Sequence, residues 1–455
     1  MDHMSSTVPF CDPTSCAAAG CDPVVCVGKG VPSNDTLFER SARAIPGGVN
    51  SSIRAFKAVG GRPYVVARGE GAHVVDVEGR RYIDLVQSYG AVILGHAHPT
   101  ITRALRDAAA DGTSFGAPTP REMKLAEAIS ARVPSCERVR LMNSGTEATS
   151  TVVRLSRGLT GRKKIIIFDG NFHGATDALL AAGGSGVATL GLPGTAGVPE
   201  EAVANTVVVP YNVVPEIDDS VAAVIVEPVA ANMGVIAPLP GFLEGLRAAC
   251  DRVGALLVFD EVITGFRLGA SGAQGAFGVT PDLTCFGKVI GGGLPIGAVG
   301  GRRDVMETLS PLGKVFHAGT LAGNPMATAA GLAALSELTP DAYAEIERRA
   351  SRLASILETS LGDRVTVTRV GTLVGIHLGS ALAGRAPTNF TEAKTTDEAG
   401  YARFFHAALT NGVAMAPGAY EAMFVGLGHD DVVLDELERR LVAAAESVAT
   451  GSSAS

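Results

Sequence analysis

The stretch ALLVFDE, residues 255–261, places five apolar residues directly before two carboxylates. Similar, largely apolar runs recur along the middle of the chain, at 164–168, 206–209, 222–226 and 283–286. Strands buried on both faces of a parallel sheet have this texture, because helices cover both faces. Helix-like stretches such as 241–252 lie between several runs, and parallel strands require such crossovers. The middle of the chain is therefore predicted to be an α/β domain with a mostly parallel sheet.

Shorter segments flank this domain on both sides. On the N-terminal side, strands are expected at 64–66, 73–77 and 81–85, and helices at 100–110 and 121–132. On the C-terminal side, helical patterns cover 327–360, 397–411 and 431–447, and a strand is expected at 370–378. These flanks, residues 34–94 and 327–455, are predicted to form a smaller α+β domain beside a large domain over 95–326.

The composition excludes several classes of protein. The 455 residues carry 38 Lys and Arg against 46 Asp and Glu, and a net charge of −8 offers no basic surface to nucleic acid or acidic lipid. An apolar fraction of 46% excludes a disordered chain. Mean hydropathy is +0.26, yet no apolar run approaches the roughly 18–20 residues of a membrane helix. Since the N-terminus also lacks a signal peptide pattern, a cytoplasmic enzyme without nucleic-acid or membrane partners is expected.

Four of the seven cysteines form a separate feature near the N-terminus. Cys11, Cys16, Cys21 and Cys26 are spaced by five residues in a segment rich in Ala, Pro, Ser and Gly. Residues 1–33 are predicted to be a disordered tail, because they contain little that could be buried. Zinc binding or thiol chemistry is the alternative, although structural zinc sites usually pair closely spaced ligands across a longer gap. No metal site is expected in the rest of the chain.

Ligands of parallel α/β sheets bind at the carboxyl ends of the strands, where three polar features occur. The first is the segment 143–148, NSGTEA, which follows an apolar run and opens a predicted helix over 148–157. Ser144, Gly145 and Thr146 combine a glycine, two hydroxyls and the first N–H groups of a helix, a set suited to phosphate. The alternative is an ordinary helix cap.

The second and third features are a carboxylate and a lysine. Asp260 directly follows the apolar run 255–259, and a buried carboxylate there needs a cationic partner or a protonated ring nitrogen. Lys288 stands in LTCFGKVIGGGLP, residues 283–295, where desolvation lowers the pKa of an amine and makes it nucleophilic. The alternatives are an Asp that caps a loop and a lysine that reaches solvent.

Taken together, the three features match the needs of pyridoxal 5′-phosphate (PLP). The lysine would bind the cofactor's aldehyde, the aspartate would keep its pyridine nitrogen protonated, and the helix start would hold its phosphate. Three weak signals with complementary roles on one α/β domain favour this interpretation over three coincidences.

Nine longer motifs carry a resemblance to a known family. They are PGGVNSSIRAFKAVGG (46–61), ILGHAHP (93–99), SFGAP (114–118), NSGTEAT (143–149), GSGVATLGLP (184–193), EPVAANMG (227–234), FDEVITGFR (259–267), GKVIGGGLPIGA (287–298) and AGTLAGNP (318–325). This set closely resembles the glutamate-1-semialdehyde 2,1-aminomutases, within the class III aminotransferases of PLP fold type I. The resemblance covers about residues 34–447 and implies a seven-stranded, mostly parallel sheet in the large domain.

The resemblance also implies roles for individual residues. Lys288 would carry the cofactor and move a proton between substrate carbons, and Asp260 would pair with the pyridinium. The other implied cofactor contacts are Ser144, Gly145, Thr146, Phe172, His173, Asn232 and Thr320, the last serving the phosphate of the other subunit. The implied substrate contacts are Ser51, Arg54 and Glu421. A homodimer with shared active sites follows from the role of Thr320, and the Gly- and Pro-rich residues 183–199 would form a lid.

The implied reaction is an internal amino exchange that starts from the pyridoxamine 5′-phosphate form. Glutamate-1-semialdehyde, an amino-aldehyde with a carboxylate, would pass through bound 4,5-diaminovalerate to 5-aminolevulinate, a tetrapyrrole precursor. Several positions depart from the family pattern: Tyr89 replaces a usual Trp, Phe172 a usual Tyr and Ala175 a usual His, the stretch 375–378 replaces a Phe-rich strand, and Gly418 replaces a common Ser. Because these changes affect the wall of the site, the alternative is a related aminotransferase or aminomutase of another amino-acid or natural-product pathway.

Overall fold

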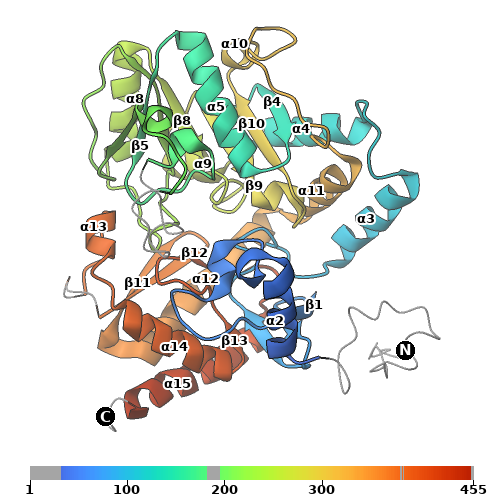
Figure 1. Ribbon diagram of the computed structural model, residues 1–455, viewed down its shortest axis with the longest axis vertical. Coiled ribbons are helices and arrows are strands. Elements are labelled where there is room, and N and C mark those ends of the chain that lie inside the picture. The colour runs from blue at the N-terminus through green and yellow to red at the C-terminus, as the bar shows by residue number, and fades with distance from the viewer. Residues whose placement is uncertain (1–31, 182–194, 380–381, 383, 452–455) are drawn as a thin grey trace.

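The computed structural model describes residues 32–181, 195–379, 382 and 384–451 (Figure 1). The segment containing Cys11, Cys16, Cys21 and Cys26, expected to be a disordered tail, lies outside the described residues. So do residues 183–194 of the expected lid. No helix in the described ranges has the length and apolar content needed to cross a bilayer.

The large sheet has seven strands. Their order is β4 (Arg138–Met142), β10 (Gly297–Gly301), β9 (Leu283–Gly287), β8 (Leu256–Asp260), β7 (Val221–Val226), β5 (Lys164–Phe168) and β6 (Thr206–Val209). Strand β10 is antiparallel to both of its neighbours, and the pairs from β9 to β6 are all parallel. The prediction of a mostly parallel seven-stranded sheet is therefore confirmed.

Helices cover both faces of this sheet, which explains the continuous apolar runs in its strands. In β8, Leu256 and Val258 join the core cluster that contains α5 (Gly145–Thr160), whereas Leu257 and Phe259 join the cluster that contains α8 (Phe242–Val253). Successive side chains of a strand point to opposite faces, so a strand covered on both sides needs apolar residues at every position. The remaining helices of this part are α3 (Pro99–Asp111), α4 (Pro120–Arg132), α7 (Glu200–Val203), α9 (Gly272–Phe277), α10 (Arg303–Met306) and α11 (Pro325–Glu337).

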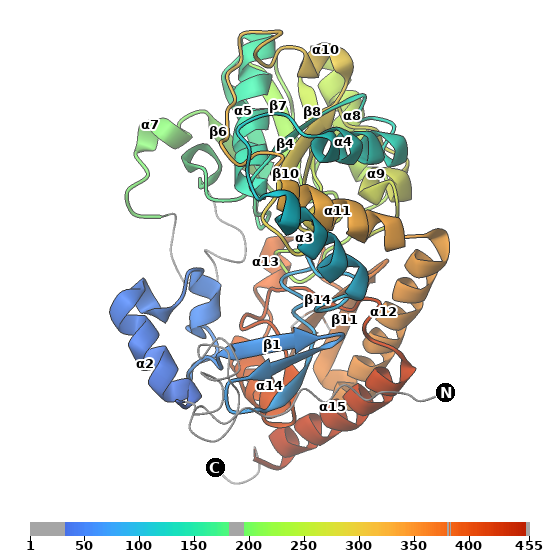
Figure 2. The ribbon, with the colours of Figure 1, turned by 90° about the vertical axis from the view of Figure 1, so that its right-hand side faces the viewer.

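A second layered unit lies below the large sheet, as Figure 2 shows. It contains a four-stranded sheet with the order β1 (Val66–Glu70), β2 (His73–Asp76), β3 (Arg81–Asp84) and β13 (Val413–Ala414). It also contains a three-stranded sheet with the order β11 (Val365–Val370), β12 (Leu373–Leu378) and β14 (Met423–Phe424). Its helices are α2 (Asn34–Ala44), α12 (Pro340–Leu361), α13 (Phe390–Ala393), α14 (Glu398–Thr410) and α15 (Asp431–Gly451). Strand β13 runs parallel to β3, so N- and C-terminal segments share one sheet.

Two strand predictions differ from the structure. Strand β1 begins only at Val66, because its partner β2 ends opposite that residue, at Asp76. The single strand expected at 370–378 is a hairpin, in which Val370 of β11 pairs with Leu373 of β12. The reversal occurs at Gly371, whose φ of 54° suits a two-residue hairpin turn.

Candidate active site

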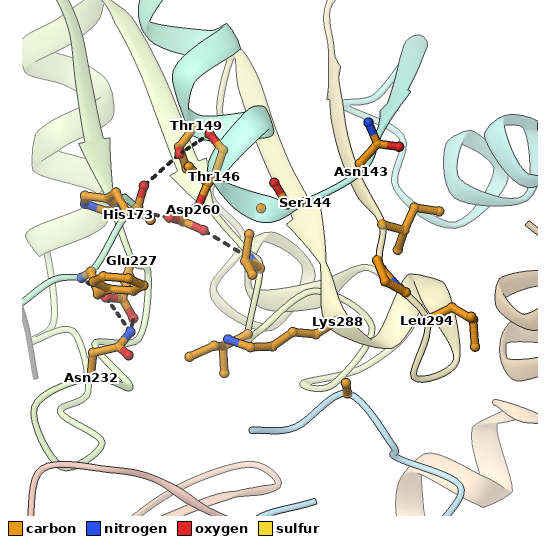
Figure 3. A pocket seen from close by; sticks show the side chains of 18 of the residues that line it. Asn143, Ser144, Thr146, Thr149, His173, Glu227, Asn232, Asp260, Lys288 and Leu294 are labelled. Carbon is orange, nitrogen blue, oxygen red and sulfur yellow. Dashed lines mark hydrogen bonds and ion pairs between the residues drawn. The ribbon is translucent and has the colours of Figure 1, made fainter. Parts of the chain in front are cut away.

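A cavity of about 430 Å³ opens at the carboxyl edge of the large sheet (Figure 3). Segments that follow β4, β5, β7, β8 and β9 all contribute to its lining. Eight of the nine expected cofactor and catalytic residues line it, Thr320 being the exception: Ser144, Gly145, Thr146, Phe172, His173, Asn232, Asp260 and Lys288. The strand order explains this, because parallel strands bring their carboxyl ends to one edge.

Asp260, the last residue of β8, forms a buried pair with His173. His173 Nδ1 lies 2.7 Å from Asp260 Oδ2, and the two residues are only 2% and 5% exposed. The other carboxylate oxygen accepts the backbone N–H of Val262 at 3.1 Å. The backbone carbonyl of His173 accepts the Thr149 hydroxyl at 2.7 Å, which fixes the histidine from α5. The carboxylate is therefore held in one orientation at the wall of the cavity.

Lys288 follows β9 directly and has a left-handed backbone, with φ of 47°. Such a conformation is unfavourable for a residue with a side chain and is typical of functional sites. The side chain is partly buried and lines the cavity. Burial lowers the pKa of its ammonium group, against the opposing influence of Asp260 and Glu227. The neutral, nucleophilic amine is thus favoured relative to an exposed lysine.

The N-terminus of α5 forms a cradle of backbone N–H groups and hydroxyls. The hydroxyl of Ser144, at the cap position of this 16-residue helix, accepts the backbone N–H of Glu147 at 3.1 Å. Glycines allow the surrounding chain to approach closely. A Cβ at Gly297 would lie 2.0 Å from the Ser144 carbonyl oxygen, and one at Gly174 would lie 2.5 Å from Thr146 Oγ1. The start of a long helix with nearby hydroxyls is suited to a phosphate group.

Glu227 is a central residue of the cavity that the sequence interpretation did not single out. It is 3% exposed and accepts backbone N–H groups from Phe172 at 2.6 Å and Ala231 at 3.1 Å. Asn232 Nδ2 lies 2.9 Å from each of its carboxylate oxygens. Burial raises the pKa of Glu227 to about 7. The available signal was its position directly after the apolar run 222–226, the same pattern that identified Asp260.

The four remaining residues of interest do not line this cavity. Ser51 precedes the short helix η2 (Ser52–Ala55), on which Arg54 is exposed, and Glu421 lies before β14. Thr320 is exposed and lines a separate cavity that also includes Phe115. Electrostatics still relates Glu421 to the site, since its charge opposes the lowering of the Lys288 pKa.

Comparisons with known proteins agree with this geometry. The model of the aminotransferase class-III family matches residues 56–425. A glutamate-1-semialdehyde 2,1-aminomutase of Bordetella avium is 52% identical over 88% of this chain and 96% of its own length. One from Roseiflexus castenholzii is 50% identical over 89% and 94%.

Solved structures show the same fold. An omega-transaminase from Sphaerobacter thermophilus is 32% identical, with a TM-score of 0.82 over 92% of this chain and 99% of that one. A glutamate-1-semialdehyde aminomutase from Pseudomonas aeruginosa PAO1 in complex with PMP is 26% identical, with a TM-score of 0.80 over 91% and 94%. The family model covers far more than half of the chain, and relatives near 50% identity match it almost end to end. The chain therefore belongs to the class-III aminotransferase family.

Proposed function

We propose that the chain is a PLP-dependent aminomutase that converts glutamate-1-semialdehyde to 5-aminolevulinate, a tetrapyrrole precursor, in the cytoplasm. The observation that carries this proposal is the meeting of Lys288, Asp260 and the start of α5 around one cavity. The aminomutases of Bordetella avium and Roseiflexus castenholzii, at 52% and 50% identity, support the same activity.

The residues of the cavity fit PLP or its pyridoxamine form. The contact with His173 fixes the buried carboxylate of Asp260 in one orientation at the cavity wall. In that position the carboxylate can pair with a protonated ring nitrogen. Ser144, Gly145 and Thr146 can hold the phosphate at the start of α5. Phe172, which is 39% exposed, offers an aromatic face beside the same cavity. Each part of the cofactor thus has a group of matching chemistry.

When bound, the cofactor can accept and return an amino group and stabilise negative charge on the carbon that carries it. Lys288, which lines the cavity, would bind its aldehyde through Nζ and would move a proton between neighbouring substrate carbons. Substrate and product are isomers: in the net change the aldehyde carbon gains an amino group and the neighbouring carbon exchanges its amino group for the carbonyl oxygen, so no separate amino donor is consumed. We assign the substrate carboxylate to Ser51 and Arg54, and substrate choice to Glu421.

The direct test is conversion of glutamate-1-semialdehyde by the purified, cofactor-loaded enzyme. The expected product is 5-aminolevulinate, formed without an added amino donor. Release of diamine during the reaction would show how well the site retains it. Failure to form 5-aminolevulinate with fully loaded enzyme would rule the proposal out.

A second candidate function is amino transfer from a separate donor. Phe172 lacks the usual ring hydroxyl, and the Sphaerobacter thermophilus neighbour with a TM-score of 0.82 is an omega-transaminase. A panel of amino acids and amines, each mixed with the PLP form, separates the two functions. Conversion of the bound cofactor to its pyridoxamine form by one of them would favour the transaminase, and no conversion would exclude it.

We also propose that the enzyme is a homodimer with shared active sites. Thr320 lies away from the Lys288 cavity, and large apolar side chains are exposed in the cavity that it lines and at nearby positions of the chain. Phe115 is 51% exposed, Phe316 68% and Leu321 51%. A patch of this kind is typical of a protein interface. Light scattering should give twice the mass of the chain, and Thr320→Ala should weaken cofactor binding without dissociating the dimer.

A further inference from the structure

The turn at residues 87–90 carries unusual backbone strain beside the cavity. Gln87, Ser88 and Tyr89 have φ values of 47°, 52° and 55°, so three successive residues with side chains are left-handed. Within the turn, the backbone N–H groups of Gly90 and Val92 both donate to the Gln87 carbonyl, at 3.0 and 3.2 Å. The strain must be held by the surrounding structure, and strain of this kind clusters at functional sites.

The side chain of Arg267 holds this turn from inside the protein. Its Nη2 donates to the Gly90 carbonyl at 2.8 Å, and its Nη1 donates to the Val425 carbonyl at 3.2 Å. The guanidinium carbon lies 5.0 Å from the centre of the Phe424 ring. Three segments are therefore tied together by one side chain: the 87–90 turn, the end of β14 and the loop after β8.

Arg267 is also an exceptional charge. It is fully buried, and it forms no ion pair with any carboxylate among the described residues. Burial lowers its pKa to about 9. Burying a charge without an opposite charge beside it costs free energy. The presence of Arg267 at this position therefore indicates that its hydrogen bonds have a specific role. Two backbone carbonyls and an aromatic face are the groups that it binds here.

Tyr89 belongs to this turn and is partly buried, and two of the proposed substrate residues act on it electrostatically. Burial and the charge of Glu421 raise the pKa of the Tyr89 phenol, and the charge of Arg54 lowers it. Both charges are therefore close enough to act on the phenol. Ala91, which follows the turn, lines the Lys288 cavity. The turn thus adjoins the Lys288 cavity in the chain and carries a phenol that feels the charges of two proposed substrate residues.

We infer that Arg267 is a positioning residue, which holds the 87–90 turn in its left-handed form and thereby sets where Tyr89 lies at the substrate end. The effect on substrate binding rests on the proposed function, whereas the effect on the shape of the 87–90 turn does not. Loss of the side chain should therefore affect substrate binding more than the chemical step.

The experiment compares Arg267→Met and Arg267→Lys with Arg162→Met. Arg162 is a matched control, because its two Nη atoms also donate to two backbone carbonyls, those of Val221 and Val253, at 3.0 and 2.8 Å. It lies at the amino edge of the large sheet, beside the first residue of β7. Hydrogen exchange of the peptide 86–93 reports the turn, and steady-state kinetics with glutamate-1-semialdehyde reports its consequence.

In Arg267→Met, exchange within 86–93 should rise by about tenfold or more. KM should rise by about tenfold, while kcat stays within about threefold. Arg267→Lys keeps the charge but has a single donor nitrogen in place of the two that bind Gly90 and Val425, so its exchange and KM should lie between those of Arg267→Met and wild type. This variant also decides the test if Arg267→Met does not fold. Arg162→Met should leave the 86–93 exchange and KM unchanged.

Wild-type exchange in 86–93 for a folded Arg267 variant would overturn the inference. So would equal losses in kcat and kcat/KM, which would place Arg267 in the chemical step. If the wild-type enzyme does not convert glutamate-1-semialdehyde, the proposed function fails, while the exchange measurement still decides whether Arg267 holds the turn.

Discussion

His173 Nδ1 and Asp260 Oδ2 lie 2.7 Å apart in a part of the protein from which solvent is almost excluded. Asp260→Asn keeps the shape of the side chain but removes its charge, so a ring nitrogen above it would no longer be held protonated. We expect activity to fall by about 100-fold or more, with the fold retained. Steady-state kinetics and circular dichroism check this.

Asp282→Asn is the control for Asp260→Asn. Asp282 is also buried, but it pairs with Arg247 at 2.8 Å and Arg302 at 2.6 Å at the amino end of β9. This substitution should lower stability with little effect on kcat. Equal activity of Asp260→Asn and wild type would contradict the assigned role of Asp260.

Lys288→Ala should remove the visible absorption band of a lysine-bound pyridoxal group, because Lys288 is the only lysine among the described residues that line the cavity. Lys124→Ala, on the exposed surface of α4, should leave the band unchanged. An absorption spectrum of each protein after loading with PLP is sufficient. A band that survives in Lys288→Ala would mean that another lysine carries the cofactor.

Gly174 and Gly161 offer a matched pair for the phosphate cradle, since their φ values are 81° and 70°. A Cβ at Gly161 would meet nothing within 4 Å, whereas one at Gly174 would lie 2.5 Å from Thr146 Oγ1. Gly161→Ala should cost about 1 kcal/mol of stability through backbone strain alone. Gly174→Ala should in addition displace Thr146 and weaken PLP binding by about tenfold, as measured by fluorescence titration. If both variants bind PLP equally well, the close approach of Gly174 to Thr146 does not determine PLP affinity.

Glu227 should make the stability of the cofactor-free protein depend on pH. Its pKa rises from 4.5 to about 7 on folding, so the folded state keeps a proton that the unfolded chain releases between these values. Stability from this group is therefore present at low pH and lost as pH rises, by up to about 3 kcal/mol. Glu227→Gln lacks this dependence. The unfolding free energy of the variant minus that of wild type should therefore increase from pH 5 to pH 8.

The control for Glu227→Gln is Glu345→Gln on the surface of α12. A hydrogen bond from Arg348 lowers the pKa of Glu345 to about 2, so this group stays charged in the folded state from pH 5 to pH 8. The stability difference between Glu345→Gln and wild type should therefore be constant over this range. Urea unfolding at both pH values gives the two differences, and a constant difference for Glu227→Gln would contradict its raised pKa.

Residues at the ends of the buried strands could be predicted from the sequence because one physical rule applied to all of them. An apolar run that ends in a polar residue marks the carboxyl edge of a parallel sheet, and the structure brings Ser144, Asp260 and Lys288 together there. The same rule applies to Glu227, which directly follows the apolar run 222–226.

Other features depend on contacts between distant segments and leave no local signal. Arg267 resembles an ordinary charged residue after a turn, and only the folded chain shows that it lies beneath Gly90 and Val425. The hairpin at Gly371 leaves a similarly weak signal, because a glycine inside an apolar run does not by itself show that the strand reverses there. The position of Arg267 and the hairpin at Gly371 both depend on contacts between distant segments rather than on residue type.

The pairing of β3 with β13 has a consequence for the order in which the two sheets can fold during synthesis. Ile83 pairs with Val413, so the two strands are separated by about 330 residues of chain. All seven strands of the large sheet lie between residues 138 and 301, and this sheet can therefore assemble on the ribosome well before residue 413 emerges. A chain stalled before that point holds the strands that line the Lys288 cavity but lacks the last strand of the four-stranded sheet. The chain can thus complete the lining of the Lys288 cavity early in translation, whereas Glu421 of the proposed substrate end emerges late.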